Sequence, residues 1–124
     1  MEKKAEYQIS SSVNEGILEI VLTGEVITSV VEELQNKVAD LIEAKEAKNV
    51  LVDSRAINSS AGIVETYISV RRPLPIRLKT NVAVVDRPEN ADIASFLETT
   101  AQNVGRSLRC FTDIDAARTW LKSK

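Results

Sequence analysis

Hydrophobic and polar positions alternate near the start of the chain, where Tyr7, Ile9 and Val13 share one face of an extended segment. A period of two predicts a half-exposed β-strand. Residues 14–16 (Asn-Glu-Gly) follow as a turn signal, because Asn and Gly tolerate positive φ. The nearly continuous apolar run at residues 17–23 predicts a second strand. We therefore expect an opening β-hairpin, with Gly24-Glu25 ending its second strand.

Apolar positions recur at helical spacing in four later segments, which predicts four amphipathic helices. Ser29 and Glu32 have the spacing of a capping box ahead of the first helix, which should end near Ala47. Gly105 is placed to end the third helix, and Thr112 is expected to cap the last one. The four segments are residues 29–47, 61–70, 90–105 and 113–121.

Three further strands are predicted between these helices: two from short β-branched runs at residues 50–53 and 82–85, and an edge strand from the alternation at residues 107–111. The stretch at residues 50–62 is central to the prediction. It indicates a buried strand that ends in Asp53, then a short polar turn, and then a helix that starts near residues 58–60. The order ββαβαβαβα predicts an α/β fold with a mixed, mostly parallel sheet, an N-terminal hairpin and about four helices. We expect residues 1–124 to form a single domain.

The composition excludes several kinds of function but indicates none. The net charge of -2 and the aromatic content of 4% argue against nucleic-acid binding. The single cysteine, Cys110, has no histidine to pair with, so no Cys/His nucleophile is expected. No residue spacing suggests a metal site, and no glycine-rich loop suggests a cofactor. With neither a signal peptide nor an apolar run of membrane-spanning length in view, we expect a cytoplasmic protein.

The order of elements and three local signatures resemble the STAS fold, closest to its SpoIIAA-like, anti-sigma-factor antagonist branch. The signatures are ILEIVLTGEVITSVVEEL, the strand VLVD with a serine-containing segment after it, and the ending LRCFTDIDAARTWL. The resemblance covers almost the whole chain. It implies a non-enzymatic regulatory or docking module of bacterial type, with a kinase-like or anti-sigma-like protein partner. Homodimer formation is a further expectation.

In antagonist members of that family, a serine in an Asp-Ser-Ser-Gly motif is phosphorylated, and the phosphate blocks partner binding. The matching residues here are Asn58, Ser59, Ser60 and Gly62, with Asn58 in place of the acid and Ala61 before the glycine. By position, Ser60 is the acceptor that the resemblance implies. The residues themselves also allow a plain alternative, in which serines at a helix start cap backbone N–H groups.

Two further polar groups follow predicted strands. Asp53 and Ser54 end one strand, and Asp86 and Arg87 end the next, so in a parallel sheet both pairs should lie on one rim. They could flank a shallow polar partner or phosphate site, or simply form a local turn network and a solvated loop. The connection at residues 71–79 carries four positive charges and no acid, which could meet an anionic partner or a lipid headgroup.

Three functions remain from the sequence. The leading hypothesis is a docking module, serine-switched or not, that binds a protein partner or a second copy through the rim around residues 54–64. The alternative is a carrier of a small apolar or lipid-like ligand, held in a cavity between the predicted helix at residues 61–70 and the sheet. An enzyme is the least favoured, because no acid–base constellation is visible.

Overall fold

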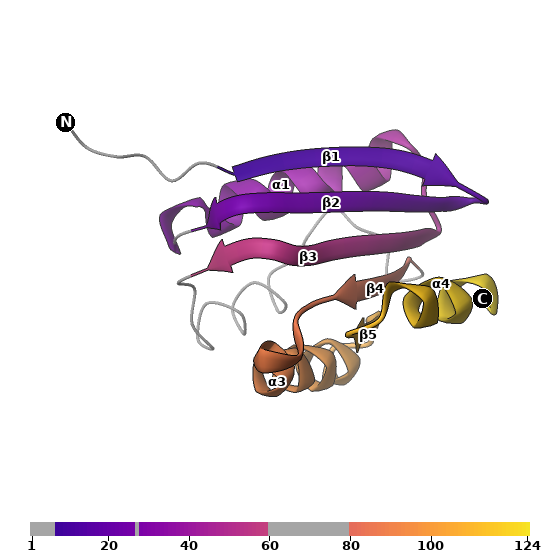
Figure 1. Ribbon diagram of the computed structural model, residues 1–124. Coiled ribbons are helices and arrows are strands. Elements are labelled where there is room, and N and C mark those ends of the chain that lie inside the picture. The colour runs from indigo at the N-terminus through magenta and orange to yellow at the C-terminus, as the bar shows by residue number, and fades with distance from the viewer. Residues whose placement is uncertain (1–6, 27, 60–79) are drawn as a thin grey trace.

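The computed structural model describes residues 7–26, 28–59 and 80–124. Five strands form one sheet in chain order, with β1 antiparallel to β2 and the remaining neighbours parallel (Figure 1). The elements are β1 (Tyr7–Asn14), β2 (Ile17–Val26), α1 (Thr28–Ala44), β3 (Asn49–Ser59), β4 (Asn81–Val85), the short 3-10 helix η1 (Pro88–Asn90), α3 (Ala91–Asn103), β5 (Ser107–Phe111) and α4 (Ile114–Lys122). The predicted mixed, mostly parallel sheet with an N-terminal hairpin is confirmed.

Three of the four predicted α-helices lie within the described residues. The predicted helix at residues 61–70 and the basic connection at residues 71–79 lie outside them. None of the described helices has the length and apolar character needed to cross a bilayer.

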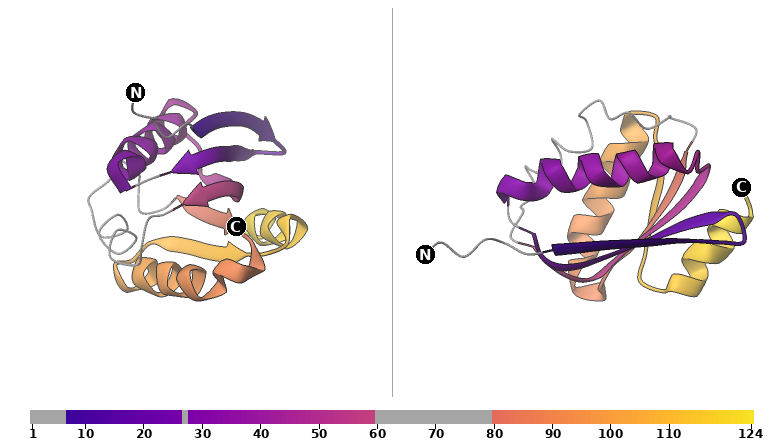
Figure 2. Two further views of the ribbon diagram at one scale, coloured as in Figure 1. Left: turned by 60° about the vertical axis from the view of Figure 1, so that its left-hand side comes forward. Right: turned by 90° about the horizontal axis from the view of Figure 1, so that it is seen from above.

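Two apolar clusters hold the sheet between its helical layers, with α1 on one face and α4 on the other (Figure 2). Leu18, Ile20 and Leu22 point from β2 toward α1 and pack with apolar side chains of that helix, including Leu34 and Ile42. Leu51, Ala83 and Val85 share the opposite face with α4. The alternation of side chains along a strand therefore divides the core into two halves. The α4 half contains Ile114, Ala117, Trp120 and Leu121, as the helical spacing predicts.

The hairpin turn follows the prediction closely. Glu15 has φ 51° and Gly16 has φ 79°, the two positive values of a type I′ turn. Asn14 pairs with Ile17 to close the two-residue loop. This turn has the twist that antiparallel strands need, so the register of β1 on β2 is set locally.

Two predicted strand ends are wrong. β2 continues through Gly24, which has φ 99°, to Val26, and β3 continues beyond Asp53 to Ser59. The two extensions pair with each other, from Thr23 opposite Ala56 to Val26 opposite Ser59. Each polar stretch is thus held as strand by its neighbour, a tertiary effect that overrides the local turn preference of Asp, Ser and Gly.

Both predicted N-caps are wrong, whereas the predicted C-terminal ends of two helices lie at or within a few residues of the observed ones. Ser29 lies inside α1 instead of before it, so the predicted capping box is wrong. α1 ends at Ala44, and Glu46 closes it at φ 49°, with Ala47 N–H donating to the Ile42 carbonyl. Gly105, at φ 80°, ends α3 as predicted. Asp113, not Thr112, caps α4 by accepting a hydrogen bond from Asp115 N–H, because its carboxylate reaches the free amide of the first turn.

Candidate functional site

β3 is longer than the strand beside it, and this difference creates the candidate site. The pairing of β3 with β4 stops at Asp53 opposite Val85, whereas β3 runs on to Ser59 beside β2. Beyond Asp53, the β4 side of β3 therefore has no strand neighbour among the described residues. Figure 1 shows this end of β3 extending past the arrowhead of β4.

Two side chains reach across where the strand pairing stops. The Ser54 hydroxyl donates a hydrogen bond of 2.9 Å to the Val85 carbonyl. The Arg87 guanidinium donates through Nη2 to the Ile57 carbonyl at 3.1 Å. The loop after β4 is therefore fastened to the extension of β3, and the two predicted polar stretches lie side by side.

Asp53 and Arg55 form a tight pair at a β-bulge. Val21 pairs with Asp53 and Thr23 with Ala56, so β3 has one residue more than β2 at this point. Both carboxylate oxygens of Asp53 accept from the Arg55 fork, at 2.9 Å from Nε and 2.8 Å from Nη2. This hydrogen bonding by Arg55 lowers the pKa of Asp53. The Asp53 carboxylate is thus an ionised structural partner.

Asp86 organises the loop at the end of β4. Its Oδ1 accepts from Arg87 N–H at 2.7 Å and from the Asn90 side-chain amide at 2.9 Å. Its own N–H donates to the Phe111 carbonyl of β5. Asp86 therefore holds η1 against the sheet and fixes the backbone from which the Arg87 side chain extends. We call Asp53, Ser54, Arg55, Ile57, Asp86 and Arg87 the rim.

The phosphate-motif residues lie at the end of this rim or beyond the described part of the chain. Asn58 and Ser59 are the last residues of β3, in register with Glu25 and Val26. The prediction that Ser59 stands at a helix start is therefore wrong, because β2 keeps it in a strand. Ser60 and Gly62 lie outside the described residues, so their roles stay predictions.

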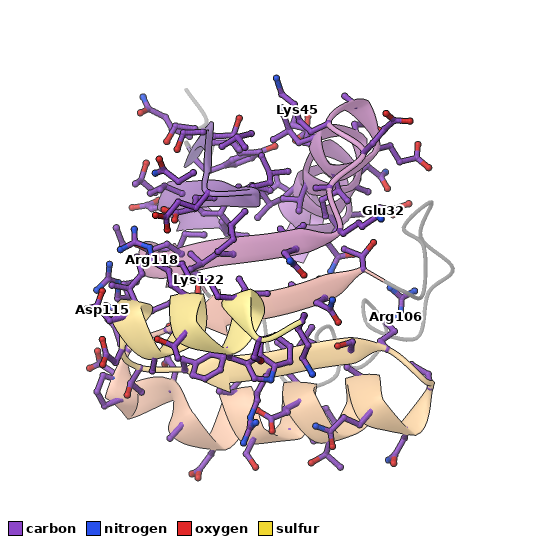
Figure 3. The ribbon with its side chains drawn as sticks, turned by 90° about the vertical axis from the view of Figure 1, so that its right-hand side faces the viewer. Glu32, Lys45, Arg106, Asp115, Arg118 and Lys122 are labelled. Carbon is purple, nitrogen blue, oxygen red and sulfur yellow. The ribbon has the colours of Figure 1, made fainter. Side chains whose placement is uncertain are left out.

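Sequence reasoning missed a buried ion pair on the other face of the sheet. Both carboxylate oxygens of Glu19, in β2, accept from Arg118 of α4 at 2.9 Å. The side chain of Glu19 is only 10% exposed, and that of Arg118 is 36% exposed. Figure 3 shows Arg118 directed from α4 toward the middle of the sheet. A charge inside the apolar run ILEIVLT was the signal that Glu19 needed a partner.

An open groove of about 430 Å³ lies between α3, the end of β5 and the start of α4. Cys110 and Phe111 line it together with Asp86, Glu98 and Asp113. Burial raises the pKa of the Cys110 thiol to about 12, and the Glu98 and Asp86 charges add to the effect. The thiol is therefore protonated at neutral pH and a poor nucleophile. The predicted ligand cavity between residues 61–70 and the sheet involves residues outside the described part of the chain.

In residues 7–26, 28–59 and 80–124, no group of three or more His, Cys, Asp or Glu side chains is arranged to hold a metal ion. The carboxylates of the rim are instead engaged by arginine and amide groups, as described above for Asp53 and Asp86. The arrangement can present hydrogen-bonding groups and positive charge to a partner.

Comparisons with known proteins show what this architecture is similar to. No protein-family model matches the chain, and no curated protein matches it in sequence. Among solved structures, an anti-sigma factor antagonist from Mycobacterium paratuberculosis superimposes with a TM-score of 0.64 at 14% identity, covering 94% of this chain and 95% of that one. An uncharacterised DUF3478-family protein from Shewanella loihica PV-4, described as having a SpoIIAA-like fold, gives a TM-score of 0.58 at 9% identity and covers 98% of both chains. The chain therefore has the SpoIIAA-like fold of the STAS domains that its sequence resembles.

Proposed function

We propose that this chain is a single, non-enzymatic docking module that binds a protein partner through the rim at the ends of β3 and β4. The observation that carries the proposal is the Arg87–Ile57 hydrogen bond, which fixes a half-exposed cation, paired with the exposed Glu89 carboxylate at 3.3 Å, beside the free extension of β3. A partner meets preformed groups there, so little ordering is needed on binding. The likeness to an anti-sigma factor antagonist supports a protein as the partner.

A docking function suits the chemistry of the rim better than catalysis does. Asp53 is ionised and committed to Arg55, and Asp86 is committed to its own loop. General acid–base catalysis needs a group within reach of substrate and free to exchange its proton. The described carboxylates of the rim already hold the fold together, which favours binding.

We further propose that phosphate at Ser59 or Ser60 switches the docking off. Ser59 is two residues beyond Ile57, roughly 7 Å along a strand, so its phosphate would enter the field of the Arg87 guanidinium. A phosphoserine carries about two negative charges at neutral pH and attracts arginine. The modification would thus change the charge of the rim and compete for the cation that a partner uses.

The test begins with a partner captured from cells of the protein's own source, identified by mass spectrometry and then purified. Calorimetry compares its affinity for the unmodified chain, for Arg87→Ala and for the control Lys45→Ala. Lys45 is exposed just beyond α1 (Figure 3), before the start of β3, whereas the rim lies toward the other end of that strand. We expect Arg87→Ala to weaken binding by about tenfold or more, as for a central arginine contact, and Lys45→Ala to leave it unchanged.

Circular dichroism and thermal unfolding verify that Arg87→Ala keeps its fold. Equal affinity of a folded Arg87→Ala variant and the unmodified chain would exclude the rim as the docking surface. For the switch, Ser59→Asp and Ser60→Asp are compared with the matching alanine variants. Loss of binding only with an aspartate supports the switch, and equal binding by all four variants refutes it.

A further inference from the structure

The two edge strands of the sheet, β1 and β5, differ in how they are protected against pairing with another strand. At one edge, β5 has five residues and carries the exposed Arg109. The Glu98 carboxylate of α3 accepts from Cys110 N–H at 2.9 Å, which occupies a backbone donor of β5. α3 also packs against this strand. A short strand, a charge and a covering helix are the usual protections against edge-to-edge pairing.

Among the described residues, the opposite edge has none of these protections. β1 is eight residues long and reads YQISSSVN, with no charged residue and no proline. Its register on β2 is continuous from Tyr7 to Asn14, without a bulge. No strand lies beyond it in the described part of the chain. Val13 is 57% exposed on this edge, the largest value among the exposed large hydrophobic side chains described.

The hairpin geometry determines which backbone groups face outward. A two-residue type I′ loop is closed by a hydrogen-bonded pair, here Asn14 with Ile17. Bonding alternates along an antiparallel pair, so the even-numbered residues of β1 bond to β2. The N–H and C=O groups of Tyr7, Ile9, Ser11 and Val13 then point away from the sheet. These four residues form a ready template for another antiparallel strand.

We propose that β1 pairs antiparallel with β1 of a second copy of this chain, about a twofold axis at Ser10, to form a continuous ten-stranded sheet. The occupant is argued from the strand's own residues: β1 carries no charge, so it can lie beside its own copy without repulsion, and a register about Ser10 pairs every residue from Tyr7 to Val13. Tyr7 of one copy meets Val13 of the other, and Ile9 meets Ser11. On the other face, Gln8 meets Ser12 and Ser10 meets its own counterpart.

A twofold contact places each residue near its equivalent, so a charged strand would repel itself. β1 is neutral throughout and avoids this cost. The register also covers Val13 with the Tyr7 ring of the other copy, on the same sheet face as the α1 cluster. The interface is small, because it consists of one strand from each copy, paired over seven residues that span roughly 24 Å. We therefore expect a weak dimer, with a Kd on the order of tens of micromolar.

Sedimentation velocity from about 1 to about 500 µM tests the proposal, since a weak dimer depends on protomer concentration. Ser10 lies on the exposed face opposite Val21, which is itself 37% exposed, so Ser10→Lys and Ser10→Glu should each fold normally. Each variant places two like charges at the axis and should weaken the dimer about tenfold or more. An equimolar mixture of the two variants should associate again, as a heterodimer. Lys45→Glu is the control for a general charge effect.

Restoration by mixing is the expected result, because only direct apposition of the two residues produces it. A wild-type chain that remains monomeric at the highest concentration overturns the proposal. So does a dimer that is equally strong in Ser10→Lys and in the wild type, which would place the interface elsewhere. Neither result bears on the rim, whose test uses different residues and a different partner.

Discussion

α4 has two basic residues, Arg118 and Lys122, and removing Arg118 should destabilise the fold more than removing Lys122. The Arg118→Met change keeps much of the side-chain volume and deletes the guanidinium. It leaves the Glu19 carboxylate, 10% exposed, without the fork that now engages both of its oxygens at 2.9 Å. The pair joins β2 to α4 across 99 residues, so its loss loosens the last helix from the sheet.

The magnitude follows from how deeply each partner lies. Deleting one partner of a fully buried pair costs about 3–5 kcal/mol, whereas fully exposed pairs contribute about 0–1 kcal/mol. Arg118 is 36% exposed, so water enters when it is removed and rehydrates part of the Glu19 carboxylate. We therefore expect a loss of about 2 kcal/mol in the free energy of unfolding, or roughly 8 °C in Tm.

Urea unfolding at pH 7 measures the loss, with Lys122→Met as the matched control. Lys122 is on the same helix and pairs with Glu15 at 2.6 Å, but these side chains are 52% and 73% exposed. The control should therefore leave the midpoint unchanged. The double variant Glu19→Met/Arg118→Met should be more stable than Arg118→Met alone, because no uncompensated carboxylate remains. A loss below about 0.5 kcal/mol in Arg118→Met, or a double variant no more stable than that single one, would refute the buried-pair reasoning.

Three further outcomes follow from the structure. Glu46→Gly should raise the free energy of unfolding by about 1 kcal/mol in the same urea assay, because Glu46 holds φ 49° at the end of α1, a conformation that costs a residue with a Cβ. Asp53→Asn should flatten the dependence of stability on acid: the folded pKa of Asp53 lies below the usual 3.8, so its pair with Arg55 stabilises above that value and is lost as the pH falls through the folded pKa. Unfolding curves collected at descending pH measure this, and an unchanged slope would contradict it. Cys110 should react with iodoacetamide at pH 8 more than about tenfold slower than a free thiol, because its pKa is raised to about 12; a rate equal to that of glutathione would contradict the assigned burial.

The sequence was sufficient where local chemistry decides the structure. The alternation of Tyr7 and Ile9 with polar neighbours, and the turn signal of Glu15-Gly16, specify a hairpin without reference to the rest of the chain. Gly105 at the end of α3 is a similar case, since positive φ favours glycine. The stripe that includes Ala117 and Leu121 was legible because one helical face must be apolar to bury itself.

The sequence misled where a neighbouring strand decides the structure. Asp53, Ser54 and Arg55 have the composition of a turn, yet they lie inside an eleven-residue strand because β2 continues beside them. The bulge at this point also changes which side chains face the core. Val52 and Ile57 both pack toward α1, although they are five positions apart along the chain, an odd offset. A strict period of two would have placed Ile57 on the opposite face.

The candidate site was likewise predictable from the sequence in part. Parallel topology alone was enough to place Ser54 near the loop of Asp86 and Arg87, because both stretches follow neighbouring parallel strands. It did not give the extension of β3 past β4, which turns Arg87 from a solvated loop residue into a hydrogen-bond donor to the Ile57 carbonyl. That extension depends on the bulge, which adds a residue to β3 and lets both long strands stay paired to their ends. A change that removes the bulge should therefore alter the rim before it alters the core between β3, β4 and α4, because Ser54 and Arg55 lie in the bulge and Ile57 lies beyond it.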